Sequence, residues 1–554
     1  MFARILGGLA LAIGLTLGLE LVHGLHASWP EALARLGELE LPLLGVSALL
    51  VWAIIVLLHA ITNRFWAAAA IVTTLATLIG AADFLKMSFR DEPLFLADVA
   101  YLSEVAFLIE NVGAGAALAL AAVLLAVPLL AWFVARSVRN SRRRRAPEPS
   151  AAPTSGRRSA LLRMASGATA FLVIFGASTF NSAGSPARAL YEAAGARWAP
   201  WNQSQNYDDN GLIAGLLYTL PAAAMDEPEG YSPASVAAVV GKYEEAAREL
   251  NAGRDPRALE GVNVVTVLSE SLADPLALPG IEAAEDPMPF LRELMESNPS
   301  GTMISSGFGG GTANVEFEVL TGMAVANFHA QVDSPFQALV ADAESFPSHL
   351  TWLVGDGAGG EGGEEAREGS AIHPYYARFY RRNAVYPALG FERASFWDSG
   401  LAHLTKLPGD RHVSDASLFG EVVRELRRSE APLFVNAVSM QNHSPQQGLA
   451  NPIPVTGPLT DAEADSAAQY TRGVKHSDEA LEEFVAELAG MDERTVVVLY
   501  GDHLPSFWST SLLDSAGPLA RYQTPWVVFA NFPLEDGAGP EVLGANQLMN
   551  QVVD

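Results

Sequence analysis

The sequence contains no cysteine. Disulfide bonds, Cys-ligated zinc, iron–sulfur clusters and thiol nucleophiles are therefore excluded. Positive charge is also scarce, since 35 Lys and Arg stand against 62 Asp and Glu, a formal net charge of −27. A protein that grips nucleic acid needs clustered Lys and Arg, so no nucleic-acid partner is expected. The lack of cysteine leaves the compartment open, because a domain of several hundred residues can bury enough core without disulfides.

Charge is distributed unevenly along the 554 residues. Residues 1–183 carry 14 basic and 11 acidic side chains, whereas residues 184–554 carry 21 and 51. The hydrophobic content of 50% excludes intrinsic disorder, and the length exceeds that of one ordinary domain. The chain therefore contains regions of different character.

Residues 1–180 are expected to form a membrane domain of five helices, because they contain apolar stretches of about the length that crosses a bilayer. The stretches are residues 5–19, 41–63, 65–82, 111–135 and 164–180. The first is short, but no small-residue cleavage site follows it, so a span is favoured over a signal peptide. One such stretch alone is also typical of a buried core helix. Their close succession indicates a membrane.

Arginines are concentrated in residues 136–158, between the last two apolar stretches. Basic loops stay on the cytoplasmic side, so this segment is expected inside and everything after residue 180 outside. A nucleic-acid patch is the competing interpretation, and the position between two spans favours the topological one. We therefore expect a multi-pass plasma-membrane protein with an extracellular C-terminal domain.

Two connecting segments are expected outside the membrane. Residues 83–110 mix charged and apolar residues, which fits either an interfacial amphipathic helix or a solvated loop. Residues 181–257 are polar and rich in small residues, with a helical pattern at residues 236–250, and are expected to form an extracellular linker with helices. Within them, residues 187–189 (Ala-Arg-Ala) resemble a signal-peptidase pattern, which would allow proteolytic release of the C-terminal domain.

Residues 258–554 are expected to form a separate globular domain, because short β-rich runs alternate with helical patterns there. The β-rich runs are residues 264–268, 433–438 and 496–500, and helical patterns include residues 418–428 and 478–488. The alternation predicts an α/β fold, a mixed sheet sandwiched by helices, with ligands beyond the carboxyl ends of the strands. A last helical pattern starts near residue 542 and is cut short, so we expect the C-terminus to be incomplete.

Ionisable residues follow two of the β-rich runs. Glu270 comes after the first, and Asp502 and His503 come after the third. Carboxylate oxygens and an imidazole in one crevice are ligands for a divalent cation. Adjacent Asp and His are also common as capping or surface residues. Glu270 adds weight, because a carboxylate that ends a buried run costs free energy unless a metal or an arginine compensates it.

A glycine-rich loop, residues 305–311, leads to Thr312 at the predicted start of a helix. The N–H groups and the dipole at that position favour a phosphate or an alkoxide. An ordinary N-cap is the alternative role for Thr312. The loop lacks a Walker lysine and the spacing of a dinucleotide site, which disfavours ATP and NAD.

The order of four segments resembles the lipoteichoic acid synthase family, a phosphoglycerol transferase branch of the alkaline phosphatase and sulfatase superfamily. The segments are residues 264–271, the loop with Thr312, Gln441-Asn442-His443-Ser444-Pro445 and Tyr500-Gly501-Asp502-His503. The resemblance extends to the N-terminal spans and to residues 206–211, 228–232 and 373–382. It implies a sulfatase-like catalytic domain on the outside of a bacterial plasma membrane.

Carried over by position, the resemblance implies a role for each candidate site residue. The implied ligands of one divalent metal ion, Mn²⁺ in preference to Mg²⁺ or Zn²⁺, are Glu270, Thr312, Asp502 and His503. Thr312 is the implied nucleophile and His443 the implied proton donor near the leaving group. The implied substrate-binding residues are Arg382, His373 and Tyr380. His443 as a loop cap and Arg382 paired with surface carboxylates are the structural alternatives.

Three features depart from the family pattern. Tyr380 replaces a tryptophan, and Tyr375 stands where an acidic residue is usual. Residues 355–370 resemble an acidic, glycine-rich insertion that forms a surface loop. The contacts to a substrate glycerol are therefore expected to differ.

The resemblance implies a phosphoglycerol transferase that takes glycerophosphate from phosphatidylglycerol through a glycerophosphoryl-threonine at Thr312. The implied acceptor is a glycolipid, a teichoic-acid-type polymer or a glycan. A metal-dependent phosphodiesterase and a non-catalytic membrane scaffold are the alternatives. Sulfatase activity is disfavoured because Thr312 cannot become formylglycine, and the absence of cysteine disfavours a phosphoethanolamine transferase.

Overall fold

The computed structural model divides the chain into two compact units, residues 1–223 and 224–554. Each unit has hydrophobic clusters of its own. The structure describes residues 2–90, 93–96, 98–99, 122, 126, 136, 155–198, 203–220, 224–255, 257–329, 332, 334–350, 367–534 and 539–553.

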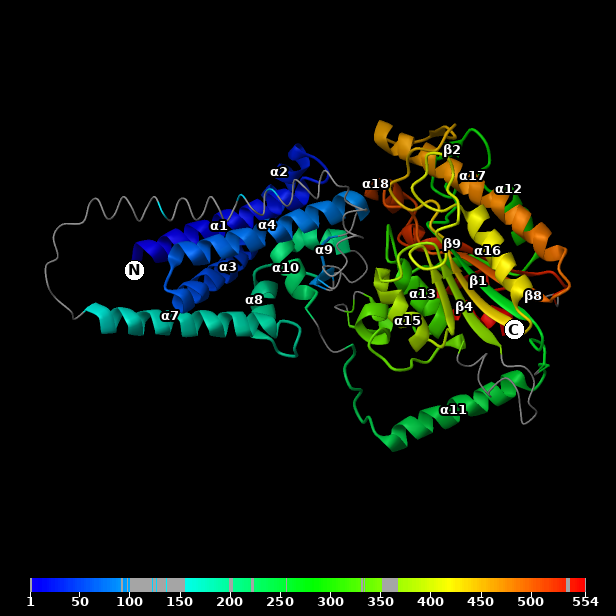
Figure 1. The fold of residues 1–554 in the computed structure, drawn as a ribbon, viewed down its shortest axis with the longest axis horizontal. Coiled ribbons are helices and arrows are strands. Elements are labelled where there is room, and N and C mark those ends of the chain that lie inside the picture. Colours follow the sequence, from blue (N-terminus) through cyan, green and yellow to red (C-terminus); the bar gives the residue numbers. More distant parts are fainter. Residues whose placement is uncertain are drawn as a thin grey trace. The chain divides into compact units, whose positions relative to one another are not determined.

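Four helices of the described part of the first unit are long and apolar enough to cross a membrane. They are α1 (Phe2–Gly24), α3 (Leu41–Thr62), α4 (Phe65–Arg90) and α7 (Ser155–Ser178). α1, α3 and α4 pack against one another, and α7 packs along α3 (Figure 1). The expected span at residues 111–135 lies almost entirely outside the described residues. α4 continues beyond the predicted end at residue 82, so the beginning of the expected outer loop is helical.

Shorter helices complete the first unit. They are α2 (Trp29–Glu38), α8 (Pro186–Ala193), α9 (Gln203–Asn210) and α10 (Leu212–Tyr218). Arg35 of α2 donates to Asp208 of α9 at 2.5 Å and to Glu20 of α1 at 3.1 Å. The backbone N–H of Leu212 also donates to Glu20, at 3.0 Å. Charged groups therefore hold the segment after α7 against the ends of the apolar helices.

The second unit is built around a mixed eight-stranded sheet in the order β10-β3-β9-β8-β1-β6-β4-β5. The strands are β1 (Asn263–Ser269), β3 (Ser300–Ile304), β4 (Glu368–His373), β5 (Arg393–Phe396), β6 (Leu433–Val438), β8 (Thr495–Gly501), β9 (Gln523–Ala530) and β10 (Val542–Gly544). The central strands β8, β1, β6, β4 and β5 are parallel, so their carboxyl ends meet at one edge. β9 is antiparallel to both of its neighbours.

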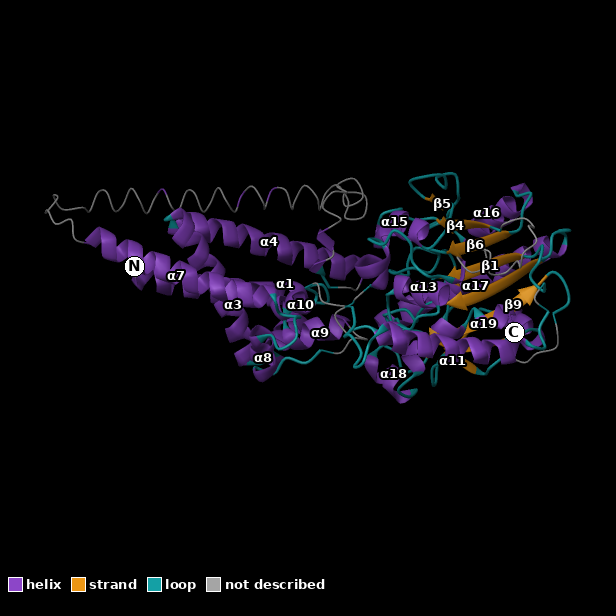
Figure 2. Ribbon diagram, turned by 90° about the horizontal axis from the view of Figure 1, so that it is seen from below, coloured by secondary structure: helices purple, strands orange, loops and turns teal. Residues whose placement is uncertain are grey.

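Helices cover both faces of this sheet, as Figures 1 and 2 show. α12 (Pro289–Ser297), α16 (Asp415–Arg428) and α17 (Asp461–Ala489) lie on one face, and α13 (Thr312–Thr321) and α15 (Arg382–Ala388) lie on the other. Alternate residues of β1 enter different cores, because successive side chains of a strand point to opposite faces. Val265 and Val267 join the α16 and α17 side, and Val264 and Leu268 join the α13 side. The predicted α/β fold with a sandwiched mixed sheet is confirmed.

Some of the predicted strands, helices and loops are confirmed by the structure, and others are wrong. The three β-rich runs are strands, and the helical pattern at residues 236–250 is α11 (Pro233–Asn251). The helix predicted from residue 542 is wrong at its start, because Val542–Gly544 form β10 and pair with β3. The end of the predicted surface loop at residues 355–370 is also wrong, since β4 begins at Glu368. Residues 355–366 of that loop lie outside the described residues.

Candidate active site

Three side chains that could hold a metal ion meet where β1 and β8 end. Glu270, Asp502 and His503 are buried, and one ligand atom of each lies within 4.8 Å of the others. His503 Nε2 is 3.7 Å from Glu270 Oε1 and 3.3 Å from Asp502 Oδ2. Because β1 and β8 are adjacent and parallel, residues far apart in the sequence end at the same place.

The electrostatics of this cluster fit a divalent cation. Burial and then the Glu270 carboxylate raise the pKa of Asp502 to about 6. Asp502 Oδ1 accepts from the N–H of Ser271 at 2.7 Å and of His503 at 2.9 Å, but Oδ2 is buried without a hydrogen-bond partner among the described residues. His503 Nδ1 lies 3.0 Å from the carbonyl of Leu504, and a proton on Nδ1 directs the Nε2 lone pair toward the carboxylates. Two carboxylates and one imidazole suit Mn²⁺ or Zn²⁺ and are tolerable for Mg²⁺.

The glycine-rich loop needs its glycines. Gly309, Gly310 and Gly311 have φ of +64°, +155° and +88°, which other residues rarely adopt. The Ser305 hydroxyl donates to the carbonyl of Asp502, and the Gly309 N–H donates to the carbonyl of Leu504 at 2.9 Å. The loop is thus tied to the segment that carries two of the candidate ligands.

Thr312 lies beside the metal-ligand cluster. It is the first residue of α13, is 8% exposed, and its hydroxyl donates to Glu270 Oε2 at 3.4 Å. The alternative role as an N-cap is wrong, because Gly311 occupies the N-cap position and no side chain caps this helix. The hydroxyl of Thr312 is therefore directed to the cluster rather than to the backbone of α13.

Arg382 forms a buried ion pair rather than a surface one. Its side chain is 1% exposed, and Nη2 and Nε donate to Glu316 Oε2 at 2.7 Å and 3.0 Å. Glu316 Oε1 accepts from the Tyr386 hydroxyl at 2.7 Å and from Asn436 Nδ2 at 2.9 Å. Glu316 lies about one turn after Thr312 in α13. The guanidinium is therefore fixed against the helix that starts with Thr312.

His373 continues this network from the end of β4. Its Nε2 lies 3.3 Å from Arg382 Nη1, and its Nδ1 lies 3.2 Å from the carbonyl of Val438. Burial, and then the positive charge of Arg382, lower the pKa of His373 well below its ordinary value. The imidazole is therefore neutral, donating from Nδ1 to Val438 and accepting at Nε2 from Arg382.

His443 follows β6, which is next to β1, and Tyr380 follows β4, which is next to β6. His443 Nδ1 lies 2.8 Å from the carbonyl of Ser444, and its ring centroid lies 5.2 Å from that of His412. The Arg382 guanidinium lies 5.3 Å from the Tyr380 ring centroid. All the candidate site residues thus follow four adjacent parallel strands or begin α13 and α15.

Sequence reasoning missed Glu316, the partner of Arg382. The signal was an acidic residue one helical turn after the predicted nucleophile, in the segment that became α13. It also missed Ser271 and Ser305, which hold Asp502 through its carboxylate and its carbonyl. Serine after a strand looks like an ordinary turn residue, so only the folded contacts reveal them.

Comparison with known families identifies the family of the second unit. A family model described as Sulfatase matches residues 262–553, more than half of the chain, and the chain belongs to the sulfatase family. The expected membership of the alkaline phosphatase and sulfatase superfamily, with similarity to lipoteichoic acid synthases, is confirmed. Together with the four apolar helices, this makes the chain a membrane protein with a C-terminal sulfatase domain.

Individual relatives show which kinds of sulfatase-family protein the chain is similar to. A Rhizobium meliloti protein named for cyclic β-1,2-glucan modification is 33% identical over 347 residues, which are 60% of this chain and 50% of that protein. The chain thus spans half the length of this relative. A Bacillus subtilis lipoteichoic acid synthase-like protein, YvgJ, is 25% identical over 142 residues, 24% of this chain and 22% of that protein.

The fold is comparable to that of a solved phosphoglycerol transferase. The Streptococcus pyogenes phosphoglycerol transferase GacH, in complex with sn-glycerol-1-phosphate, aligns with a TM-score of 0.53 at 24% identity. The alignment covers 59% of this chain and 82% of that structure. This similarity shows the fold of the second unit.

Proposed function

We propose that the chain is a membrane-anchored phosphoglycerol transferase that moves glycerophosphate from phosphatidylglycerol to a hydroxyl group of a cell-envelope acceptor. The observation that carries the proposal is the Thr312 hydroxyl at the start of α13, beside the buried ligand set of Glu270, Asp502 and His503. A nucleophilic hydroxyl next to a divalent-cation site is the arrangement that phosphoryl transfer through a covalent intermediate requires.

The reaction has two halves. In the first, Thr312 Oγ1 gives its proton to solvent and forms a bond to the phosphorus of the lipid, and the bond from phosphorus to the diacylglycerol oxygen breaks. The leaving oxygen takes up a proton, for which His443 is the donor, and glycerophosphoryl-Thr312 remains. In the second half an acceptor hydroxyl attacks the same phosphorus and gives its proton to His443. The bond from phosphorus to Thr312 breaks, and the Thr312 oxygen takes a proton from solvent, which restores the threonine hydroxyl.

The remaining residues bind and orient the substrate. The residues that would hold a divalent cation are Glu270, Thr312, Asp502 and His503. When bound, such an ion lowers the pKa of a coordinated hydroxyl and neutralises charge on a phosphate oxygen. Arg382, His373 and Tyr380 supply a positive and polar wall for the phosphoryl group, with Arg382 held in place by Glu316.

A glycan is the acceptor that we favour among glycolipids, teichoic-acid-type polymers and glycans. The support is the Rhizobium meliloti relative, whose name refers to modification of cyclic β-1,2-glucan. We further propose that residues 1–180 are a multi-pass anchor, that residues 181–257 connect it to the catalytic domain at residues 258–554, and that this domain faces the outside of the plasma membrane.

The nucleophile is tested by the substitution Thr312→Ala in the full chain. Release of diacylglycerol from vesicles that contain phosphatidylglycerol and Mn²⁺ is expected to fall about a thousandfold or more. Thr321→Ala is a matched control, because Thr321 ends the same helix and its hydroxyl donates to the carbonyl of Phe317 at 2.7 Å. An unchanged rate in Thr312→Ala would refute the assignment.

The acceptor is tested on the same vesicles with and without a β-glucan. A transferase forms glycerophosphorylated glucan, whereas a phosphodiesterase releases glycerophosphate to water at the same rate in both. Neither product with the wild-type chain, under conditions where it binds Mn²⁺, would favour the non-catalytic scaffold.

A further inference from the structure

A carboxylate without a counter-ion lies behind the candidate active site. Asp415 begins α16, is 0% exposed, and forms no ion pair with any described residue. Burial raises the pKa of its carboxyl group to about 6, and the hydroxyls of Ser477 and Ser439 offset part of the rise. A buried carboxyl group of this kind costs stability and is typical of positions kept for function.

The contacts of Asp415 converge on the segment that leads to His443. Its Oδ2 accepts from the Ser477 hydroxyl at 2.6 Å, and its backbone N–H donates to Gln441 Oε1 at 3.0 Å. Ser477 Oγ also accepts from Gln441 Nε2 at 2.9 Å and from Asn442 Nδ2 at 3.0 Å. Asp415 and Ser477 therefore fix the two residues immediately before His443.

Helix α17 is shaped to receive this segment. A Cβ atom at Gly473, one turn before Ser477, would overlap Asn442 Oδ1, so only glycine allows the close approach. Asn442 has φ of +70°, a left-handed conformation that its hydrogen bond to Ser477 of the helix holds in place. The path of the chain into His443 thus depends on contacts with α17.

The same segment also holds a candidate metal ligand. The backbone N–H of Glu270 donates to Ser439 Oγ at 3.0 Å, and the Ser439 N–H donates to the carbonyl of Leu268 at 2.9 Å. Residues 439–443 therefore join the ends of β1 and β6. A shift of this segment would move both Glu270 and His443.

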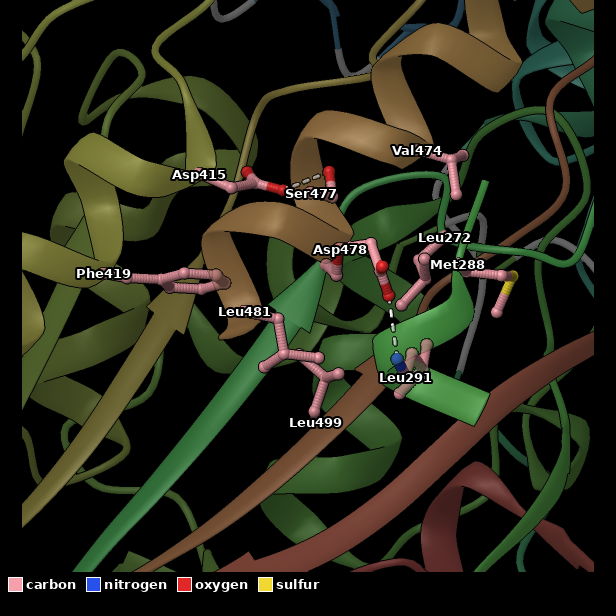
Figure 3. Close-up of a pocket in the computed structure, with 11 residues that line it drawn as sticks. Leu272, Met288, Leu291, Asp415, Phe419, Val474, Ser477, Asp478, Leu481 and Leu499 are labelled. Carbon is pink, nitrogen blue, oxygen red and sulfur yellow. Dashed lines mark hydrogen bonds between the residues drawn. The ribbon is translucent and has the colours of Figure 1, made fainter. Parts of the chain in front are cut away.

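A small cavity adjoins Asp415, between the sheet and helices α12, α16 and α17 (Figure 3). It has room for about one water molecule and is lined mainly by apolar side chains. The second carboxylate at this cavity, Asp478, accepts from the N–H groups of Leu291 and Phe290 at the start of α12. Asp415 caps no other helix, and its Oδ1 has no hydrogen-bond partner among the described residues.

An acidic residue in the first turn of a helix is also an ordinary stabilising feature. That role needs neither burial nor the contacts with residues 439–443. Asp461, the first residue of α17, occupies the same helical position and is exposed. It is therefore a matched control that has the charge and the helix terminus without the contacts.

We propose that Asp415 is a positioning residue for the transfer reaction. Through Ser477 and Gln441 it fixes residues 439–443. These residues in turn position His443 and Glu270. The inference rests on the proposed function for its catalytic part. Its structural part, the fixing of residues 439–443, stands on the contacts alone.

The test compares Asp415→Asn, Ser477→Ala and Asp461→Asn in the full chain. In Asp415→Asn, kcat for diacylglycerol release is expected to fall about tenfold to a hundredfold, with KM for phosphatidylglycerol within about threefold of wild type. The melting temperature at pH 7.5 is expected to be unchanged or higher, because an uncompensated buried carboxylate is removed. Ser477→Ala should show the same loss of kcat, and Asp461→Asn should resemble wild type.

Hydrogen–deuterium exchange supplies a measurement that does not use the reaction. Backbone amides of residues 439–446 are expected to exchange faster in Asp415→Asn and Ser477→Ala than in wild type or Asp461→Asn. Unchanged exchange, unchanged kcat, or a loss of kcat that accompanies a lower melting temperature would overturn the proposal. If wild type itself releases no diacylglycerol, the proposed function fails, and faster exchange in the two variants still supports the positioning role of Asp415.

Discussion

At the scale of single residues, the unexpected feature is the pair formed by Arg382 and Glu316. Both side chains are at most 1% exposed, and hydrogen bonds from Tyr386 and Asn436 satisfy the second carboxylate oxygen. Buried ion pairs seldom stabilise a fold more than well-packed apolar residues of similar volume would. The pair holds the guanidinium next to the start of α13, as the proposed binding of the phosphoryl group by Arg382 requires.

Removal of one member of this pair is expected to be costly. Glu316→Ala leaves the Arg382 charge buried without a counter-ion, so the free energy of unfolding should fall by about 3 to 5 kcal/mol. Glu368→Ala is the control, because Glu368 pairs with Arg393 on the surface, where such a pair contributes about 0 to 1 kcal/mol. Denaturant unfolding, followed by tryptophan fluorescence, measures both. Equal losses in the two variants would contradict the role given to Glu316.

At the scale of elements, a strand could be predicted from the sequence where its own residues form a mainly apolar run. β1 and β8 are fully buried strands rich in apolar residues, and Glu270 and Asp502 follow them directly, so the strands and the candidate ligands could be predicted together. β10 could not, because three residues hold no periodicity and its pairing with β3 depends on residues far away in the sequence. Glu316 and Asp415 were missed for the same reason, because the roles inferred for them depend on contacts between elements that are far apart in the sequence.

The carboxylates of Glu270 and Asp502 lie close together where β1 and β8 end, and this proximity predicts that metal binding depends on pH. The pKa of Asp502 is raised to about 6 from an ordinary value of 3.8, so the metal-free folded state binds a proton that the unfolded state releases. Stability of the metal-free protein therefore falls as pH rises from about 4 to 6. A bound cation replaces that proton, so Mn²⁺ at about 100 times its pH 7.5 Kd should stabilise by about 3 kcal/mol at pH 7.5 and by about 1 kcal/mol at pH 5, where protonation weakens its binding about tenfold.

Melting temperatures with and without Mn²⁺ across this pH range measure the effect. Asp502→Asn is expected to lose most of the stabilisation by Mn²⁺ at every pH, while Asp461→Asn should keep it. The same stabilisation by Mn²⁺ at pH 5 and pH 7.5 in the wild-type chain would show that protons and metal do not compete at this site.

At the scale of the whole molecule, the distribution of charge affects how the C-terminal domain meets the proposed lipid donor. Residues 184–554 carry 21 basic and 51 acidic side chains, a net charge of −30, and the proposed donor lipid is anionic. Long-range attraction therefore cannot bring the catalytic domain to its substrate. Covalent connection to the apolar helices can, because a tethered domain meets the bilayer at an effective concentration in the millimolar range, about 10⁻³ M.

The tether can be tested by separation of the two units. Residues 224–554 contain the whole sheet and both of its cores, so this piece is expected to fold alone. Added to vesicles of phosphatidylglycerol, it should release diacylglycerol at least about tenfold more slowly than the full chain reconstituted in the same vesicles. Added salt should reduce the difference, because it screens the repulsion between the acidic domain and the lipid. On a monomeric short-chain phosphatidylglycerol the two proteins should have equal rates, and a difference there would mean that the apolar helices act on the catalytic site itself rather than through proximity.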